Sequence, residues 1–200
     1  MKVDVKTLDG QPMAQQEATV VVGAALRIAP GFVATTLDDP GGIETTIEAV
    51  YSRTQGRYII RAVITRAVDP ERELTPGNLR QLVVQQILQA ATPRCIALTL
   101  DDLGDPAARW LTLADLTRTE GKIIPAWMAT EVTRRGWSEE RLLVVQLLYG
   151  AAALSGQPPL QLMTIELGIP HRTAGDWVKR TRDKGYLEGL TYFTGRQADG

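Results

Sequence analysis

Residues 160–184 constrain the fold more than any other part of this 200-residue chain. Two short helical patterns meet there at Gly168 and Ile169. A glycine permits a tight turn, and apolar residues at fixed offsets on either side let two helices bury against each other. The residues expected to be buried are Met163, Leu167, Ile169, Ala174, Trp177 and Val178. This pattern is typical of a helix-turn-helix, whose second helix enters the major groove of DNA.

The remaining positions of the second helix form the predicted contact face. His171 and Arg172 lie in its first turn, where side chains reach base edges, and the basic residues from Lys179 onward are better placed for phosphates. The predicted DNA contacts are His171, Arg172, Thr173, Gly175, Asp176, Lys179, Arg180, Arg182, Lys184 and Arg196. Between positions 170 and 184 there are five basic and two acidic residues, so this face is modestly cationic.

The stretch Leu-Gly-Ile-Pro-His-Arg-Thr-Ala-Gly-Asp-Trp-Val-Lys-Arg at 167–180 resembles the helix-turn-helix of small DNA-binding proteins of actinobacteria and their phages. The resemblance extends from near residue 125 over the C-terminal third of the chain, and it implies DNA binding. Asp176 departs from it, because that family pattern usually has a basic or polar residue there. Residues 185–196 resemble the wing of a winged helix, which would bring Arg196 to the phosphates or the minor groove.

The N-terminal half reads mostly as strands. Residues 43–51 and 57–65 are rich in β-branched side chains and are joined by a glycine-containing loop, which predicts a β-hairpin. Further strands are expected at 2–8, 19–28, 32–36 and 94–100, all in one antiparallel sheet. Apolar residues at helical spacing predict one packed helix over 75–91, starting with Thr75 and Pro76. Residues 101–124 are expected to be a connector with a short helix near 107–116.

From residue 125 onward the pattern is helical. A short helix is expected at 126–135, and Ser138 followed by two glutamates predicts the start of a longer one. The chain is therefore predicted to be an α+β protein with two domains. Residues 1–122 would form an antiparallel sheet with one helix, serving dimerisation or partner contact. Residues 123–200 would form an all-helical helix-turn-helix domain with a short wing.

Composition limits the function classes. The formal net charge is −1; residues 1–120 carry 12 basic and 15 acidic side chains, and residues 121–200 carry 10 and 8. A strongly basic nucleic-acid binder is thereby excluded, and DNA affinity must come from local charge. Cys95 is the single cysteine and lies in an apolar run, so it is expected to be a small buried hydrophobe in a reducing cytoplasm. No signal peptide is evident, and the apolar segment 18–26 is too short to span a membrane.

No enzyme signature is found. The acidic pairs at 38–39 and 101–102 adjoin proline or glycine, so turn chemistry explains them. One histidine and one cysteine cannot assemble a usual zinc site, and no metal or cofactor is expected.

The function predicted from the sequence is sequence-specific binding of double-stranded DNA as a transcriptional regulator. A homodimer is favoured, and no effector is indicated. One alternative is a phage DNA-packaging recognition subunit resembling a small terminase, in which the sheet domain would drive ring assembly. Another is a protein-interaction module with a degenerate helix-turn-helix, for which Asp176 and the low net charge argue.

Overall fold

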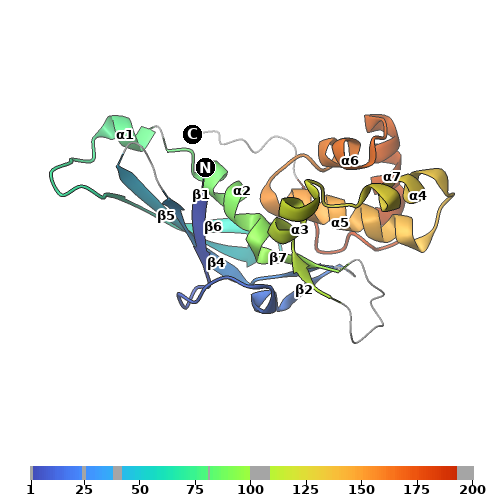
Figure 1. Cartoon of the computed structure of the whole chain (residues 1–200), viewed down its shortest axis with the longest axis horizontal. Coiled ribbons are helices and arrows are strands. Elements are labelled where there is room, and N and C mark those ends of the chain that lie inside the picture. The colour runs from blue at the N-terminus through green and yellow to red at the C-terminus, as the bar shows by residue number, and fades with distance from the viewer. Residues whose placement is uncertain (1, 24–25, 38–41, 81, 100–108, 193–200) are drawn as a thin grey trace.

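A computed structural model describes residues 2–23, 26–37, 42–80, 82–99 and 109–192. Within these ranges the chain is an α+β protein with two four-stranded antiparallel sheets and seven α-helices. The larger sheet lies toward one end of the molecule and the C-terminal helices toward the other (Figure 1). The α+β class predicted from the sequence is confirmed.

The larger sheet has the strand order β1-β4-β5-β6. Its strands are β1 (Lys2–Lys6), β4 (Gly31–Leu37), β5 (Ile43–Ser52) and β6 (Arg57–Ala67). The predicted hairpin is confirmed as β5 and β6, and Gly56 in its turn adopts a φ of 62°. A bulge opposite Glu48 and Ala49 leaves Arg61 without a partner residue in the β5–β6 register. Such a bulge bends the strand and changes the direction in which the following side chains point.

The prediction of a single sheet is wrong. The second sheet has the order β2-β3-β7-β8 and consists of β2 (Val20–Val22), β3 (Leu26–Ile28), β7 (Ile96–Leu98) and β8 (Leu111–Thr112). The strand expected at 19–28 is itself a hairpin, because Gly23 has a φ of 63° and the chain reverses there. Ile28 then pairs with Ile96, which carries the 26–28 segment into the second sheet.

The helix predicted over 75–91 is interrupted. It consists of α1 (Pro76–Arg80) and α2 (Val84–Cys95), and Val83 between them has a ψ of 77°, outside the helical region. Helix α2 also runs further than expected and includes Pro93. Tertiary contact explains the extension, since Ala91, Thr92 and Cys95 are all buried between α2 and the strands.

Cys95 is 1% exposed, which confirms the expected buried position. Burial raises the pKa of the Cys95 thiol far above its ordinary value, so the group remains protonated. The neighbouring Tyr58 is also buried, and its hydroxyl donates to the carbonyl of Ala29 at 2.8 Å. The pKa of Tyr58 is raised chiefly by burial, so this corner of the core is uncharged.

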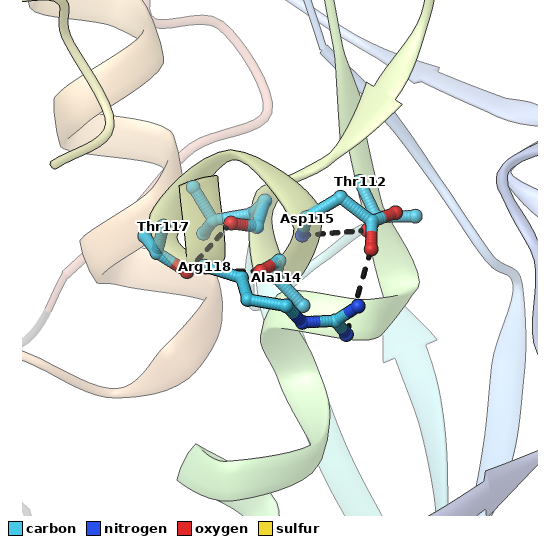
Figure 2. Close-up of polar contacts among 6 residues, drawn as sticks. Thr112, Ala114, Asp115, Thr117 and Arg118 are labelled. Atoms are coloured by element: carbon cyan, nitrogen blue, oxygen red, sulfur yellow. Dashed lines mark hydrogen bonds and ion pairs between the residues drawn. The ribbon is translucent and has the colours of Figure 1, made fainter. Parts of the chain in front are cut away.

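The short helix predicted near 107–116 lies further along the chain, as α3 (Leu113–Glu120). Figure 2 shows how it starts: the amide of Asp115 donates to Thr112 Oγ1 at 3.1 Å, and the Thr112 hydroxyl donates to Asp115 Oδ2 at 2.6 Å. Arg118 lies 3.6 Å from the Asp115 carboxylate. This side-chain cap satisfies a backbone donor that a helix start otherwise leaves unpaired, and it sets the start at residue 113.

Four helices make up the C-terminal part: α4 (Ala126–Arg134), α5 (Glu139–Ser155), α6 (Pro159–Leu167) and α7 (His171–Asp183). The predicted cap of α5 is confirmed, because Ser138 Oγ accepts from the amide of Arg141 at 3.3 Å. Helix α5 ends at Gly156, which has a φ of 70°. Residues on every side of α5 are buried, as expected for a helix enclosed by other elements.

Helix α5 joins the helices to the sheets. Gly150 lies against Leu26 of β3, where a Cβ would collide with the leucine side chain. The fully buried side chain of Gln146 lies against Gly23, and its amide nitrogen donates to the carbonyl of Tyr186. A single cluster of buried hydrophobic residues runs from Val3 to Leu190 and continues across residue 122. The helices are therefore packed on the sheets through one core.

The predicted wing is wrong for its described part. Residues 185–189 form turns rather than strands, with positive φ at Gly185 and Gly189, and residues 190–192 are irregular. Leu187 and Leu190 are buried, and the Tyr51 hydroxyl donates to the carbonyl of Gly189 at 2.9 Å. The apolar residues read as wing strands instead attach the chain after α7 to the β5–β6 hairpin. No helix in the described ranges is long and apolar enough to cross a membrane.

Candidate nucleic-acid interface

Helices α6 and α7 meet at a turn that the local sequence explains. Gly168 ends α6 with a φ of 66°, and its amide donates to the carbonyl of Thr164 at 3.0 Å. The amide of Ala174 donates to the carbonyl of Pro170 at 3.0 Å in the first turn of α7. A glycine in the left-handed region avoids the clash that a Cβ causes there, so the chain reverses within three residues.

The residues predicted to hold the two helices together are all buried. Their exposed fractions lie between 0% and 8%, and they are Met163, Leu167, Ile169, Ala174, Trp177 and Val178. This part of the sequence prediction is confirmed. The inner face of α7 is thus fixed, and the orientation of its outer face follows from it.

Trp177 anchors α7 through contacts that extend beyond α6. The Arg141 guanidinium of α5 lies 4.2 Å from the centre of the Trp177 ring, and the ring of Trp137 meets Trp177 edge-on at 6.1 Å between centroids. Arg141 also donates to the carbonyls of Val132 and Arg135 at the end of α4. Burial lowers the pKa of Arg141, although the guanidinium remains charged. One side chain therefore connects α4, α5 and α7.

These roles of Arg141 and Trp137 were not predicted from the sequence. A signal was available, because Arg141 is a charged residue at the start of an otherwise apolar helical pattern. A buried arginine needs hydrogen-bond acceptors and aromatic faces, and the carbonyls that end α4 and the nearby tryptophans provide both.

Most of the predicted DNA contacts lie on the surface. Seven of them are exposed: His171, Arg172, Asp176, Lys179, Arg180, Arg182 and Lys184. Thr173 and Gly175 are half-buried, and Arg196 lies outside the described residues. The structure thus places eight of the ten predicted contacts on α7, and Lys184 is the residue that caps its C-terminus.

Four exposed residues form the centre of the outer face of α7. At about 100° per residue, Arg172, Asp176, Lys179 and Asp183 fall within one narrow strip opposite the buried Ala174 and Thr181. We call these four residues the α7 ridge. Its charges alternate along the helix and sum to zero. In the described ranges no ion pair involves a side chain of α7.

Two cations beside the ridge have intramolecular partners. Arg182 donates to the Tyr149 hydroxyl at 2.8 Å, and its guanidinium lies 5.4 Å from the centre of that ring. Arg180 lies 4.9 Å from the centre of the Trp137 ring. Both arginines were predicted only as phosphate contacts, and their aromatic partners are a feature of the tertiary structure. Arg172 and Lys179 remain as cations on the ridge itself.

Metal chemistry receives no support from the described residues, which contain no group of three or more histidine, cysteine or acidic side chains close enough to hold an ion. The acidic pairs at 38–39 and 101–102 lie outside the described ranges. No protein-family model, curated protein or solved structure matches this chain significantly.

Proposed function

We propose that this protein binds double-stranded DNA in a sequence-specific manner and acts as a transcriptional regulator. Helices α6 and α7 would serve as a helix-turn-helix, with α7 in the major groove. The observation that carries the proposal is the α7 ridge: a row of exposed polar and charged side chains on a helix whose opposite face is fully anchored. A helix held in this way can enter a groove as a rigid element.

The residue types on the ridge suit base recognition. Arg172, in the first turn, can donate two hydrogen bonds to O6 and N7 of guanine. Asp176, one turn further, can accept a hydrogen bond from N4 of cytosine, so an acidic residue is compatible with reading a base edge. Lys179 follows and is suited to a phosphate. A site with two G·C pairs, one read by Arg172 at its guanine and the other by Asp176 at its cytosine, is the expected preference.

The two sheets would serve assembly in this proposal. A homodimer would present two α7 helices to half-sites about one helical turn apart, roughly 34 Å. The modest charge predicts moderate affinity with a shallow dependence on salt concentration, because few phosphates can be neutralised.

Selection of bound fragments from a random duplex pool tests the proposal. It should return a two-fold symmetric motif with two G·C pairs in each half-site. A pool that gains no sequence preference after repeated selection would refute sequence-specific binding. Measurement of the oligomer's mass in solution complements the selection, since a ring larger than a dimer would favour a DNA-packaging role over that of a transcriptional regulator.

Substitutions on α7 test the assigned roles. Arg172→Ala should cost on the order of 1–3 kcal/mol on the selected site and little on unrelated DNA. Lys179→Ala should weaken all duplexes similarly and reduce the slope of log affinity against log salt by about one unit. Arg134→Ala, an exposed arginine on α4, is the matched control and should change neither quantity. Equal losses from all three variants would mean that α7 is not the contact surface.

A further inference from the structure

A groove of about 400 Å³ lies between α7 and the N-terminal turn of α6. Its walls come from three helices and from the segment after α7, and they include Tyr149, Leu160, Gly175 and Tyr192. Sites for small molecules in proteins usually have volumes of about 300–1,000 Å³, so the groove is large enough for a single-ring compound.

The apolar part of the groove suits an aromatic ring. Pro158, Pro159 and Leu160 line the groove, together with Tyr149 and Tyr192. Gly175 contributes no side chain, and a Cβ placed there would come within 4.0 Å of Leu160 Cδ1. The glycine therefore leaves room between the two helices that any other residue would reduce.

The polar part of the groove is cationic. Lys179 and Arg182 supply the positive charges, and His171 and Asp183 also line it. Lys179 is exposed and has no carboxylate partner in the described ranges. The Arg182 guanidinium is held in position by its hydrogen bond to the Tyr149 hydroxyl, which leaves its other N–H donors available. A flexible ammonium and a fixed guanidinium together suit a carboxylate.

We propose that this groove binds a small aromatic carboxylate, with the ring between the apolar walls and the carboxylate on Lys179 and Arg182. Because His171, Gly175 and Lys179 also belong to the proposed DNA face, the bound compound competes with DNA. This competition rests on the proposed function, whereas binding of the compound to the free protein does not.

Titration of benzoate into the full-length protein without DNA, followed by NMR, tests the site. Benzoate should bind saturably, and both acetate and benzyl alcohol should bind at least about tenfold more weakly, since each lacks one half of the recognition. Acetate binding as tightly as benzoate would overturn the proposal.

Two variants with a matched control locate the site. Lys179→Gln should weaken benzoate binding about tenfold or more, because a charge-assisted hydrogen bond is lost. Gly175→Leu should abolish it by filling the groove, and leucine is a better helix former than glycine. Lys184→Gln changes an exposed lysine of the same segment that does not line the groove, and it should bind like the wild type. Equal weakening by Lys179→Gln and Lys184→Gln would reveal general anion attraction and refute the site.

Competition is measured with the selected duplex. Benzoate should raise the apparent Kd of the wild type for DNA, and benzyl alcohol at the same concentration should leave it unchanged. If DNA binds and benzoate does not bind the free protein, the groove is not a site for an aromatic carboxylate and the inference is wrong. If benzoate binds and no duplex does, the proposed function fails while the ligand site stands.

Discussion

Arg141 is the side chain whose removal tests the packing of the helices most directly. It is 6% exposed, its Nε donates to the carbonyl of Val132 at 2.9 Å, and its Nη2 reaches the carbonyl of Arg135. It also stacks on Trp177. The carbonyls at the end of α4 have no partner within their own helix, so Arg141 satisfies them.

Arg141→Met keeps an unbranched apolar side chain and removes the guanidinium. A buried carbonyl left unpaired costs about 1–3 kcal/mol, and the lost stacking costs about 1 kcal/mol. Part of this is offset because a charge no longer has to be buried. The net loss should be about 2–3 kcal/mol, which lowers the Tm by roughly 4–12 °C in a chain of this size.

Urea unfolding followed by circular dichroism measures the loss, with two comparison variants. Arg141→Lys keeps the charge but loses the planar fork, so it should be destabilised nearly as much as Arg141→Met. Arg134→Met changes an exposed arginine at the end of α4 and should stay within about 0.5 kcal/mol of the wild type. The reasoning is refuted if Arg141→Met is as stable as Arg134→Met.

Three further outcomes are expected. Gly168→Ala should cost about 1 kcal/mol in urea unfolding, and Gly168→Asn should cost less, because no heavy atom lies within 4 Å of an added Cβ and only the positive φ opposes it; equal stability of the alanine variant and the wild type would contradict this. The pKa of Glu140 is lowered in the folded protein, chiefly by a hydrogen bond with Ser138. The ionised carboxylate therefore stabilises the fold above the unfolded-state pKa of about 4.5, and this stabilisation is lost as pH falls through the folded-state pKa. Stability should therefore fall less in Glu140→Gln than in the wild type between about pH 6 and pH 3, and identical pH profiles would exclude the effect. Tyr51→Phe should cost about 0.5–1.5 kcal/mol and speed amide exchange in residues 185–190, since the bond to Gly189 is lost; unchanged exchange would mean that the bond does not hold this segment.

The C-terminal helices were predictable because their signals are local. The Ser138 cap lies beside the segment that it starts, and Gly168 lies at the turn that it allows. The buried set around Trp177 follows from helical spacing alone. The hairpin of β5 and β6 was predictable for the same reason, because β-branched strands flank a short glycine-containing loop.

Misassigned elements depend on partners distant in the chain. Residues 26–28 belong to the second sheet because they pair with residues 96–98. Neither segment has a sequence pattern that would identify the other as its partner. Residues 185–190 have the apolar composition of a wing, but Leu187 and Leu190 are buried in the hydrophobic core instead. Composition indicates that such residues will be buried but leaves open against which surface.

For the candidate interface, the sequence by itself determined the helices, their turn and the identity of the outward residues on α7. The reason is that helical periodicity can be read within a few residues and that a glycine affects the backbone at its own position. Only the tertiary structure decided which of those cations have partners. Tyr149 and Trp137 lie outside α7, and the packing of α5 brings them against Arg182 and Arg180. The tertiary structure also decided that a groove lies beside Gly175, because the space between two helices depends on their crossing angle and not on either sequence alone.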